Sequence, residues 1–169
     1  TKSFFIARTL IYFLLWSVLS RALYYHSTRY SSPDSLVSLR KYSGIGTLIF
    51  ALTISFAAFD WLMTLDPHWY STMFGVYIFS GSFLVSIAFI TIILFYLRSI
   101  GILYNEINVE HYHDLGRIMF GFTVFWAYIA GFQYYLIWYG NLPEEIEWYL
   151  ARSHGTWMNL SLLLVFGHF

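Results

Sequence analysis

Residues 72–97 read TMFGVYIFSGSFLVSIAFITIILFYL and place 26 uncharged residues in a row near the middle of the chain. A helix needs about 20 apolar residues to cross the hydrocarbon core of a bilayer, which is roughly 30 Å thick. The run is continuously apolar, whereas a strand of a membrane barrel alternates between apolar and polar residues. The stretch therefore predicts a transmembrane α-helix.

Similar runs occur on both sides of this stretch. Together they predict helices over residues 4–23, 44–65, 72–97 and 115–138, and a fifth helix that begins near residue 156. Only 11% of the residues are charged, about half the fraction in an average soluble domain. We therefore expect an all-α fold, a polytopic transmembrane helical bundle. The chain lacks an initial Met and stops within an apolar run, so we expect it to be part of one transmembrane domain of a longer subunit.

Charge and cysteine content exclude several functions. The formal net charge is zero, so no basic field would attract nucleic acid. The chain has no cysteine, which excludes Cys-ligated iron–sulfur clusters and covalently attached c-type haem. Haem b is disfavoured because it usually needs mid-membrane histidines on facing helices, and only His168 could qualify. We expect no metal, haem or iron–sulfur cluster on this chain, and any electrons would pass to a cofactor held elsewhere.

The distribution of basic residues predicts the orientation of the helices. Cytoplasmic connections are rich in Lys and Arg. The connections between helices 1 and 2 and between helices 3 and 4 carry such residues at or near their ends: Arg21, Arg29, Arg40, Lys41, Arg98 and Arg117. We expect these two connections in the cytoplasm, and the 2–3 and 4–5 connections at the outer face.

Asp60, Asp66 and His68 lie within nine positions at the predicted outer end of helix 44–65. Asp60 is five residues inside that helix, and an ionisable group at such a depth marks a function by default. We predict that it accepts protons, although it could instead bond a Ser, a Thr or the backbone across the bundle. Asp66 precedes Pro67 and could be only a turn residue. His68 could be a proton relay, because histidine changes charge near neutral pH, or an ordinary interfacial residue.

Other polar and aromatic residues are predicted near the same level. Tyr77 lies five residues into helix 72–97, and Gln133 lies five residues before Trp138. With Trp61 and Tyr135 they have the make-up of a pocket for a flat, amphipathic head group such as a quinol. The alternative is an aromatic-rich core that contains a satisfied Gln.

Two connections contain clusters of chemically capable residues. Glu110, His111 and His113 could be read as metal ligands, but no matching set lies nearby, and we expect Asp114 to cap helix 115–138. The second cluster comprises Glu144, Glu145 and Glu147. It is interpreted as a solvated surface or as a docking site for a basic cytochrome.

Two long blocks carry a family resemblance. Residues 59–82, FDWLMTLDPHWYSTMFGVYIFSGS, and residues 113–145, HDLGRIMFGFTVFWAYIAGFQYYLIWYGNLPEE, closely resemble the quinol-interacting membrane subunits of bacterial alternative complex III. The second block looks most like the member designated F, whose paralogue in the same complex is designated C. Both belong with the NrfD/PsrC-like membrane anchors, and the resemblance extends over nearly all of residues 44–152.

The resemblance implies an NrfD-like four-helix bundle in the bacterial inner membrane, with the 2–3 and 4–5 connections in the periplasm. It implies a quinol:cytochrome c or terminal-oxidase oxidoreductase that oxidises menaquinol or ubiquinol near the outer face. The implied partners are the paralogous membrane subunit, an iron–sulfur protein, a multihaem cytochrome c, a terminal oxidase and membrane lipids.

Two alternatives to a quinol site remain open. The chain could be a structural or proton-conducting subunit of the same complex without a quinol site of its own. An independent transporter is disfavoured, because the polar residues cluster at one face and helices 2–4 lack central prolines.

Overall fold

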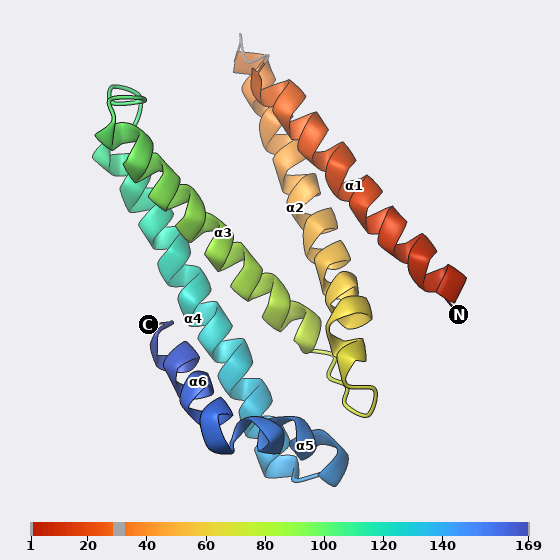
Figure 1. Cartoon of the computed structure of the whole chain (residues 1–169). Coiled ribbons are helices and arrows are strands. Elements are labelled where there is room, and N and C mark those ends of the chain that lie inside the picture. Colours follow the sequence, from red (N-terminus) through yellow and green to blue (C-terminus); the bar gives the residue numbers. More distant parts are fainter. Residues whose placement is uncertain (1, 29–32, 169) are drawn as a thin grey trace. The chain divides into compact units, whose positions relative to one another are not determined.

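The computed structural model describes residues 2–28 and 33–168, and over these residues the chain is helical without any β-strand (Figure 1). Arg29, one of the basic residues used to predict orientation, lies outside the described residues. The helices are α1 (Lys2–Thr28), α2 (Pro33–Trp61), α3 (Phe74–Ser99), α4 (Val109–Gly140), α5 (Pro143–Arg152) and α6 (Gly155–Phe166), and a 3₁₀ turn, η1 (Met63–Leu65), follows α2.

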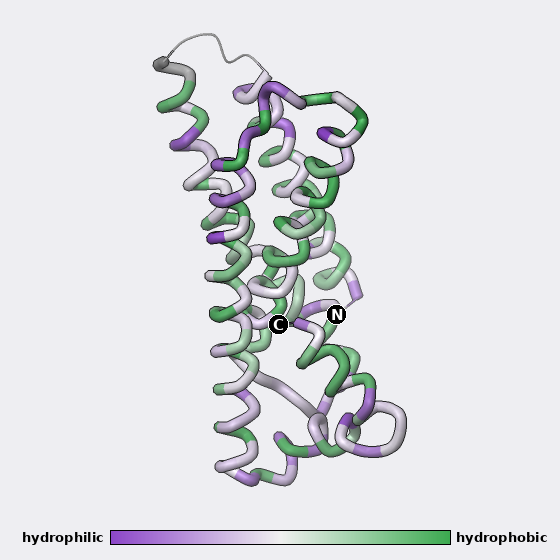
Figure 2. Tube along the Cα trace, turned by 90° about the vertical axis from the view of Figure 1, so that its left-hand side faces the viewer, coloured by the Kyte–Doolittle hydropathy of each residue, from purple (hydrophilic) through white to green (hydrophobic). Residues whose placement is uncertain are grey.

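Four of these helices, α1 to α4, are long and apolar enough to cross a membrane. Hydrophobic residues dominate their middle portions, and most hydrophilic residues lie near helix ends or in connections (Figure 2). Many large apolar side chains on the four helices are exposed, including Leu10, Leu48 and Ile92. Such surfaces are unfavourable in water and suit a lipid environment, so the structure supports the expected all-helical, multi-pass membrane protein.

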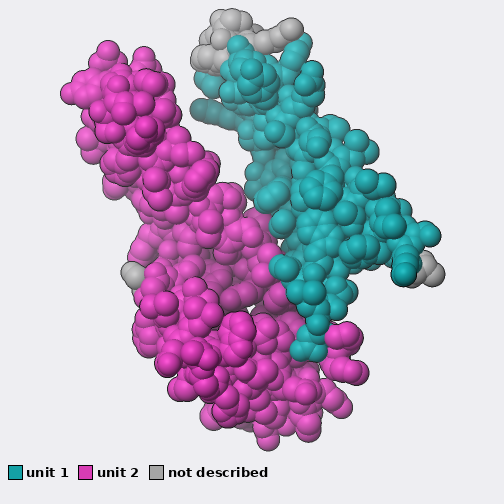
Figure 3. All heavy atoms as spheres, viewed as in Figure 1, with its two compact units in different colours: residues 1–66 teal, residues 67–169 magenta. Residues whose placement is uncertain are grey.

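The chain divides into two compact units, residues 1–66 and residues 67–169 (Figure 3). The first unit contains α1, α2 and η1. The second contains α3, α4, α5 and α6.

In the first unit, α1 and α2 form a helical hairpin. Ala57 and Ala58 are almost fully buried, and such small side chains let two helix backbones approach closely. The indole N–H of Trp16 donates a hydrogen bond of 2.9 Å to the hydroxyl oxygen of Thr53. The Trp16–Thr53 contact thus joins the middle of α1 to α2.

In the second unit, α3 and α4 pack through aromatic rings. The ring centroids of Phe83 and Phe122 are 4.2 Å apart. A Cβ atom on Gly81 would lie 3.4 Å from the Trp126 ring, which is an ordinary contact distance, so α3 lies directly against this ring of α4. The hydroxyl of fully buried Ser80 donates to the backbone oxygen of Tyr77 at 2.9 Å, which satisfies this buried donor within its own helix.

The short helix α5 is attached to the start of the second unit by Trp69. This indole is 3% exposed and stacks on Trp148 of α5 with a centroid separation of 4.9 Å. Its N–H also donates to the backbone oxygen of Glu145 at 3.2 Å. The turn into α5 uses Asn141 in the left-handed region, with φ of 47°, and Pro143 in the first turn of the helix.

α1 ends at Thr28 rather than at residue 23, and α2 begins at Pro33 rather than at residue 44. The sequence expectations and the structure also differ in three other places. α2 ends at Trp61 rather than at residue 65, and Asp66 takes an extended conformation, as expected before Pro67. The expectation that Asp114 caps its helix is wrong, because α4 already begins after Asn108. Asn108 accepts the N–H of His111, and His111 Nδ1 accepts the N–H of Asn108. The third difference is α5, which occupies part of a predicted connection.

The Trp69 contact generates the first prediction. Trp69→Phe keeps a ring against Trp148 but removes the N–H that reaches Glu145, so we expect a loss of about 1–2 kcal/mol in unfolding free energy. We also expect faster protease cleavage around residues 141–154 of the protein in detergent. Trp157→Phe is the matched control because Trp157 is exposed on α6. Equal behaviour of the two variants would contradict the role given to Trp69.

Candidate functional site

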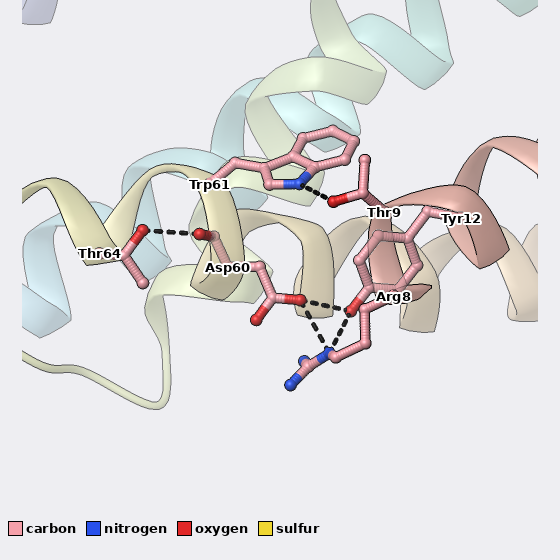
Figure 4. Close-up of polar contacts among 6 residues, drawn as sticks. All are labelled: Arg8, Thr9, Tyr12, Asp60, Trp61 and Thr64. Carbon is pink, nitrogen blue, oxygen red and sulfur yellow. Dashed lines mark hydrogen bonds and ion pairs between the residues drawn. The ribbon is translucent and has the colours of Figure 1, made fainter. Parts of the chain in front are cut away.

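Arg8, Tyr12 and Asp60 form a polar cluster between α1 and α2 (Figure 4). Asp60 Oδ2 accepts the Tyr12 hydroxyl at 2.7 Å and pairs with Arg8 Nε at 2.9 Å. Arg8 Nε also donates to the Tyr12 hydroxyl oxygen at 3.2 Å. The side chains of Arg8 and Asp60 are 31% and 15% exposed, and Tyr12 is 6% exposed. The cluster is therefore a largely enclosed, hydrogen-bonded ion pair.

Helix geometry explains how the three side chains meet. Arg8 and Tyr12 are four residues apart on α1 and so share one face of that helix. Asp60 lies at the penultimate position of α2. The helical hairpin returns it to α1, 48 residues after Tyr12.

The end of α2 is fixed by two further hydrogen bonds beside Asp60. The Thr64 hydroxyl donates to the backbone oxygen of Asp60 at 2.6 Å, which satisfies a carbonyl that the helix end leaves without a partner. The indole N–H of Trp61 donates to the Thr9 hydroxyl oxygen at 3.2 Å. The Trp61–Thr9 bond thus holds the end of α2 against α1 independently of the Asp60 carboxylate, and the Thr64 bond closes the helix end.

An aromatic cluster lies directly beside the ion pair. The Trp61 ring centroid is 5.9 Å from that of Tyr12, 5.7 Å from that of Phe13 and 5.8 Å from that of Trp16. Apolar rings lower the local dielectric constant and so strengthen the attraction between Arg8 and Asp60.

The cluster keeps unused hydrogen-bonding capacity. Within the described part of the chain, Asp60 Oδ1 accepts no hydrogen bond, and the terminal NH₂ groups of Arg8 donate none. An acceptor and two donors therefore remain beside one another. This combination can receive a hydroxyl group at Asp60 and a carbonyl group at Arg8, which are the two oxidation states of a quinol oxygen.

The other predicted proton-handling residues are not joined to this cluster by any described contact. Asp66 is partly buried and His68 is exposed. Neither side chain forms a hydrogen bond or ion pair within residues 2–28 and 36–168. Their predicted roles as relay residues stay predictions.

The predicted quinol-binding residues fall in both units. Trp61 belongs to the aromatic cluster described above. Tyr77 lies on α3 with its ring 5.5 Å from Trp126. Gln133 is 7% exposed on the buried face of α4, and Tyr135 lies on an exposed face of the same helix. Because these residues belong to different units, their predicted common level with Asp60 stays a prediction.

Gln133 is buried without a described hydrogen bond. Its neighbours one helical turn away, Ile129 and Ile137, are also buried. The alternative of an aromatic-rich core that contains a satisfied Gln therefore stays a prediction.

A group of tyrosines lies beside α5 in the second unit. The Tyr134 and Tyr149 ring centroids are 5.2 Å apart. Burial raises the pKa of Tyr149, the nearby phenols of Tyr77 and Tyr134 raise it further, and the positive charge of Arg152 opposes the increase. The Tyr149 hydroxyl therefore keeps its proton and can donate a hydrogen bond at any physiological pH.

Sequence reasoning missed Arg8 and Tyr12 as partners of Asp60. From the sequence, Arg8 is only a residue near a helix end, and Tyr12 does not stand out. The available signal was their spacing of four residues on the helix adjacent to Asp60. Across the described residues no group of three His, Asp or Glu side chains could hold a metal ion.

Comparison with models of known protein families gave no match, and comparison with curated proteins gave none either.

The ion pair generates a prediction about stability. Arg8→Gln or Asp60→Asn should each cost about 2 kcal/mol, between the value for an exposed pair and the roughly 3–5 kcal/mol for a fully buried one. The double variant should cost less than the sum of the two, with a coupling of about 1–2 kcal/mol. Thermal unfolding of the four proteins in detergent measures this cycle.

The matched control is the pair Asp114 and Arg117, which is 3.4 Å apart and has both side chains about two-thirds exposed. The same two substitutions there should give a coupling below about 0.5 kcal/mol. Equal coupling in the two cycles would show that enclosure between α1 and α2 adds nothing.

The raised pKa of Tyr149 predicts how the stability of the fold depends on pH. The folded chain holds this proton to a higher pH than the unfolded chain, whose tyrosine pKa is about 10. The folded state therefore binds more protons above about pH 10, and its stability falls as the pH rises further. Tyr149→Phe should reduce the difference between unfolding temperatures measured at about pH 8 and about pH 11. Tyr139→Phe, which changes an exposed residue of α4, should leave it unchanged; identical effects would contradict the assignment.

Proposed function

We propose that this chain is a membrane subunit of a respiratory quinol-oxidising complex and that it contributes a quinol site or a proton path near one membrane surface. The observation that carries the proposal is the enclosed Arg8–Tyr12–Asp60 cluster with its open carboxylate oxygen. The resemblance of residues 59–82 and 113–145 to the membrane subunits of alternative complex III supplies the class of complex. The proposal includes the NrfD-like bundle, the bacterial inner membrane and a periplasmic position for the site.

The chemistry follows from the free groups of the cluster. A quinol hydroxyl would donate to Asp60 Oδ1, and the carboxylate would take its proton as the quinol is oxidised. The carbonyl of the product would accept from the terminal nitrogens of Arg8. Oxidation releases two electrons and two protons. The electrons would pass to iron–sulfur and haem centres of partner subunits, and the protons would leave at the outer face.

The remaining predicted residues have supporting roles in this proposal. Asp66 and His68 would carry protons onward from Asp60. Trp61 would contribute apolar surface for the head group beside Asp60, and the part that Tyr77, Gln133 and Tyr135 take in binding it stays a prediction from the sequence.

A second candidate function is favoured by the same ion pair. Arg8 and Asp60 join α1 to α2, so the cluster could serve only to hold the hairpin together within the complex. In that case the chain would be a structural or proton-conducting subunit, and the working quinol site would lie in the paralogous membrane protein of the complex.

The test is quinol oxidation by the isolated complex carrying Asp60→Asn, with turnover expressed per assembled complex. A general base contributes about 10²–10⁴-fold to a rate, so we expect turnover to fall at least about 100-fold. Tyr12→Phe keeps both charges and should lower turnover less. Asp114→Asn removes an exposed, Arg-paired carboxylate and should leave turnover unchanged.

The two candidate functions give different results. Unchanged turnover of assembled Asp60→Asn complexes, together with lower thermal stability, would establish the structural role and refute the catalytic one.

A further inference from the structure

A cavity of about 250 Å³ lies along the last two turns of α1 and is lined by Arg21, Tyr24, Tyr25 and Thr28. These residues follow one another at steps of three, one and three, which places them on one face of the helix. A guanidinium, two phenols and a hydroxyl thus border one hollow at the end of a helix that is able to cross a membrane.

Arg21 differs from Arg8 and Arg117 in its surroundings. Arg8 pairs with Asp60, and Arg117 pairs with Asp114. Arg21, in contrast, forms no hydrogen bond or ion pair with any side chain in the described ranges 2–28 and 36–168. A charge on a lipid-exposed helix is costly without a partner, so an anion bound from outside the chain would stabilise it.

The position of Arg21 along α1 fits the level of lipid phosphate groups. The 27 residues of α1 span about 40 Å at 1.5 Å per residue, close to the full thickness of a bilayer with its head groups. Arg21 precedes the last residue, Thr28, by about 10 Å along the axis. A long arginine side chain reaches from there to the interface, and Tyr24 and Tyr25 then lie where tyrosine is enriched.

The hydrogen-bond donors in the cavity match a phosphate group. The Tyr24 side chain is 70% exposed, and its hydroxyl bonds no described residue. Arginine binds phosphate oxygens through two parallel N–H groups, and a phenol adds a third donor. Thr28 donates its own hydroxyl to the backbone oxygen of Tyr24 at 2.9 Å, which reduces the negative character of the helix end.

Charge and apolar surface together favour a lipid over a free phosphate ion. Residues 21–42 carry a net charge of +3 with histidine neutral, which attracts anionic head groups. Leu14 and Val18 precede Arg21 by seven and three residues, on the same side of α1, and both are exposed. An acyl chain would cover them while the phosphate reached Arg21.

We propose that Arg21 and Tyr24 bind the phosphate group of an anionic phospholipid at the C-terminal end of α1. The site depends on α1 lying in a membrane and not on quinol oxidation.

The test is native mass spectrometry of the purified protein in its natural assembly, equilibrated in detergent with equal amounts of phosphatidylglycerol and phosphatidylcholine. We expect Arg21→Gln to lose one bound phosphatidylglycerol per copy of the chain relative to the wild type, and Tyr24→Phe to weaken its retention. Arg21→Lys should retain the lipid in part, because it keeps the charge and loses the planar fork. Only assembled particles are counted, so misfolded variants do not contribute.

The matched control is Arg40→Gln. Arg40 is exposed at the start of α2, has no described partner and lies outside the cavity, so this variant should retain phosphatidylglycerol like the wild type. Equal losses from both variants would show a diffuse surface charge and refute a site. Equal retention of phosphatidylcholine, or displacement of the lipid by inorganic phosphate, would refute the choice of an anionic lipid.

Discussion

The cost of a charge in hydrocarbon governs how polar residues are arranged along these helices. A helix satisfies its own backbone hydrogen bonds, but a charged side chain on a spanning helix requires a partner or a route to the interface. α1 shows both solutions. Arg8 meets Asp60 within the protein, and Arg21 faces a hollow at the end of the helix without an acid among its described neighbours. α3 avoids the problem, since Arg98 in its last turn is its only charged residue.

The same constraint decides how much of the site could be predicted. Asp60 could be singled out because an acid next to a long apolar run is costly. Its pairing could not be predicted, because it depends on the register of the hairpin, and both arginines of α1 had an adequate explanation as residues near helix ends. Asn108 and Asp114 are equally good N-cap residues by type, and the choice depends on the reciprocal bond that His111 adds.

α5 shows a different limit of sequence reasoning. Its ten residues are too few to span a bilayer, so the test for apolar runs could not detect it. Its signals were local: Pro143 in the first turn, Glu144 and Glu145 near the N-terminus, and Arg152 in the last turn. The anchor on Trp69 lies more than 70 residues earlier in the chain and is a tertiary contact that no local pattern encodes.

The ion pair and the proposed proton acceptor place opposing demands on Asp60, and Arg8 connects them. A proton on Oδ1 would leave the Oδ2 contact to Tyr12 in place but would remove the charge that Arg8 faces. An arginine without a partner costs about 2.5–3.5 kcal/mol at the centre of a membrane helix, and a partly exposed one such as Arg8 costs less. Arg8 therefore gains from a charged Asp60, and the charge that stabilises the hairpin is the same one that a proton acceptor at this position would give up in each turnover.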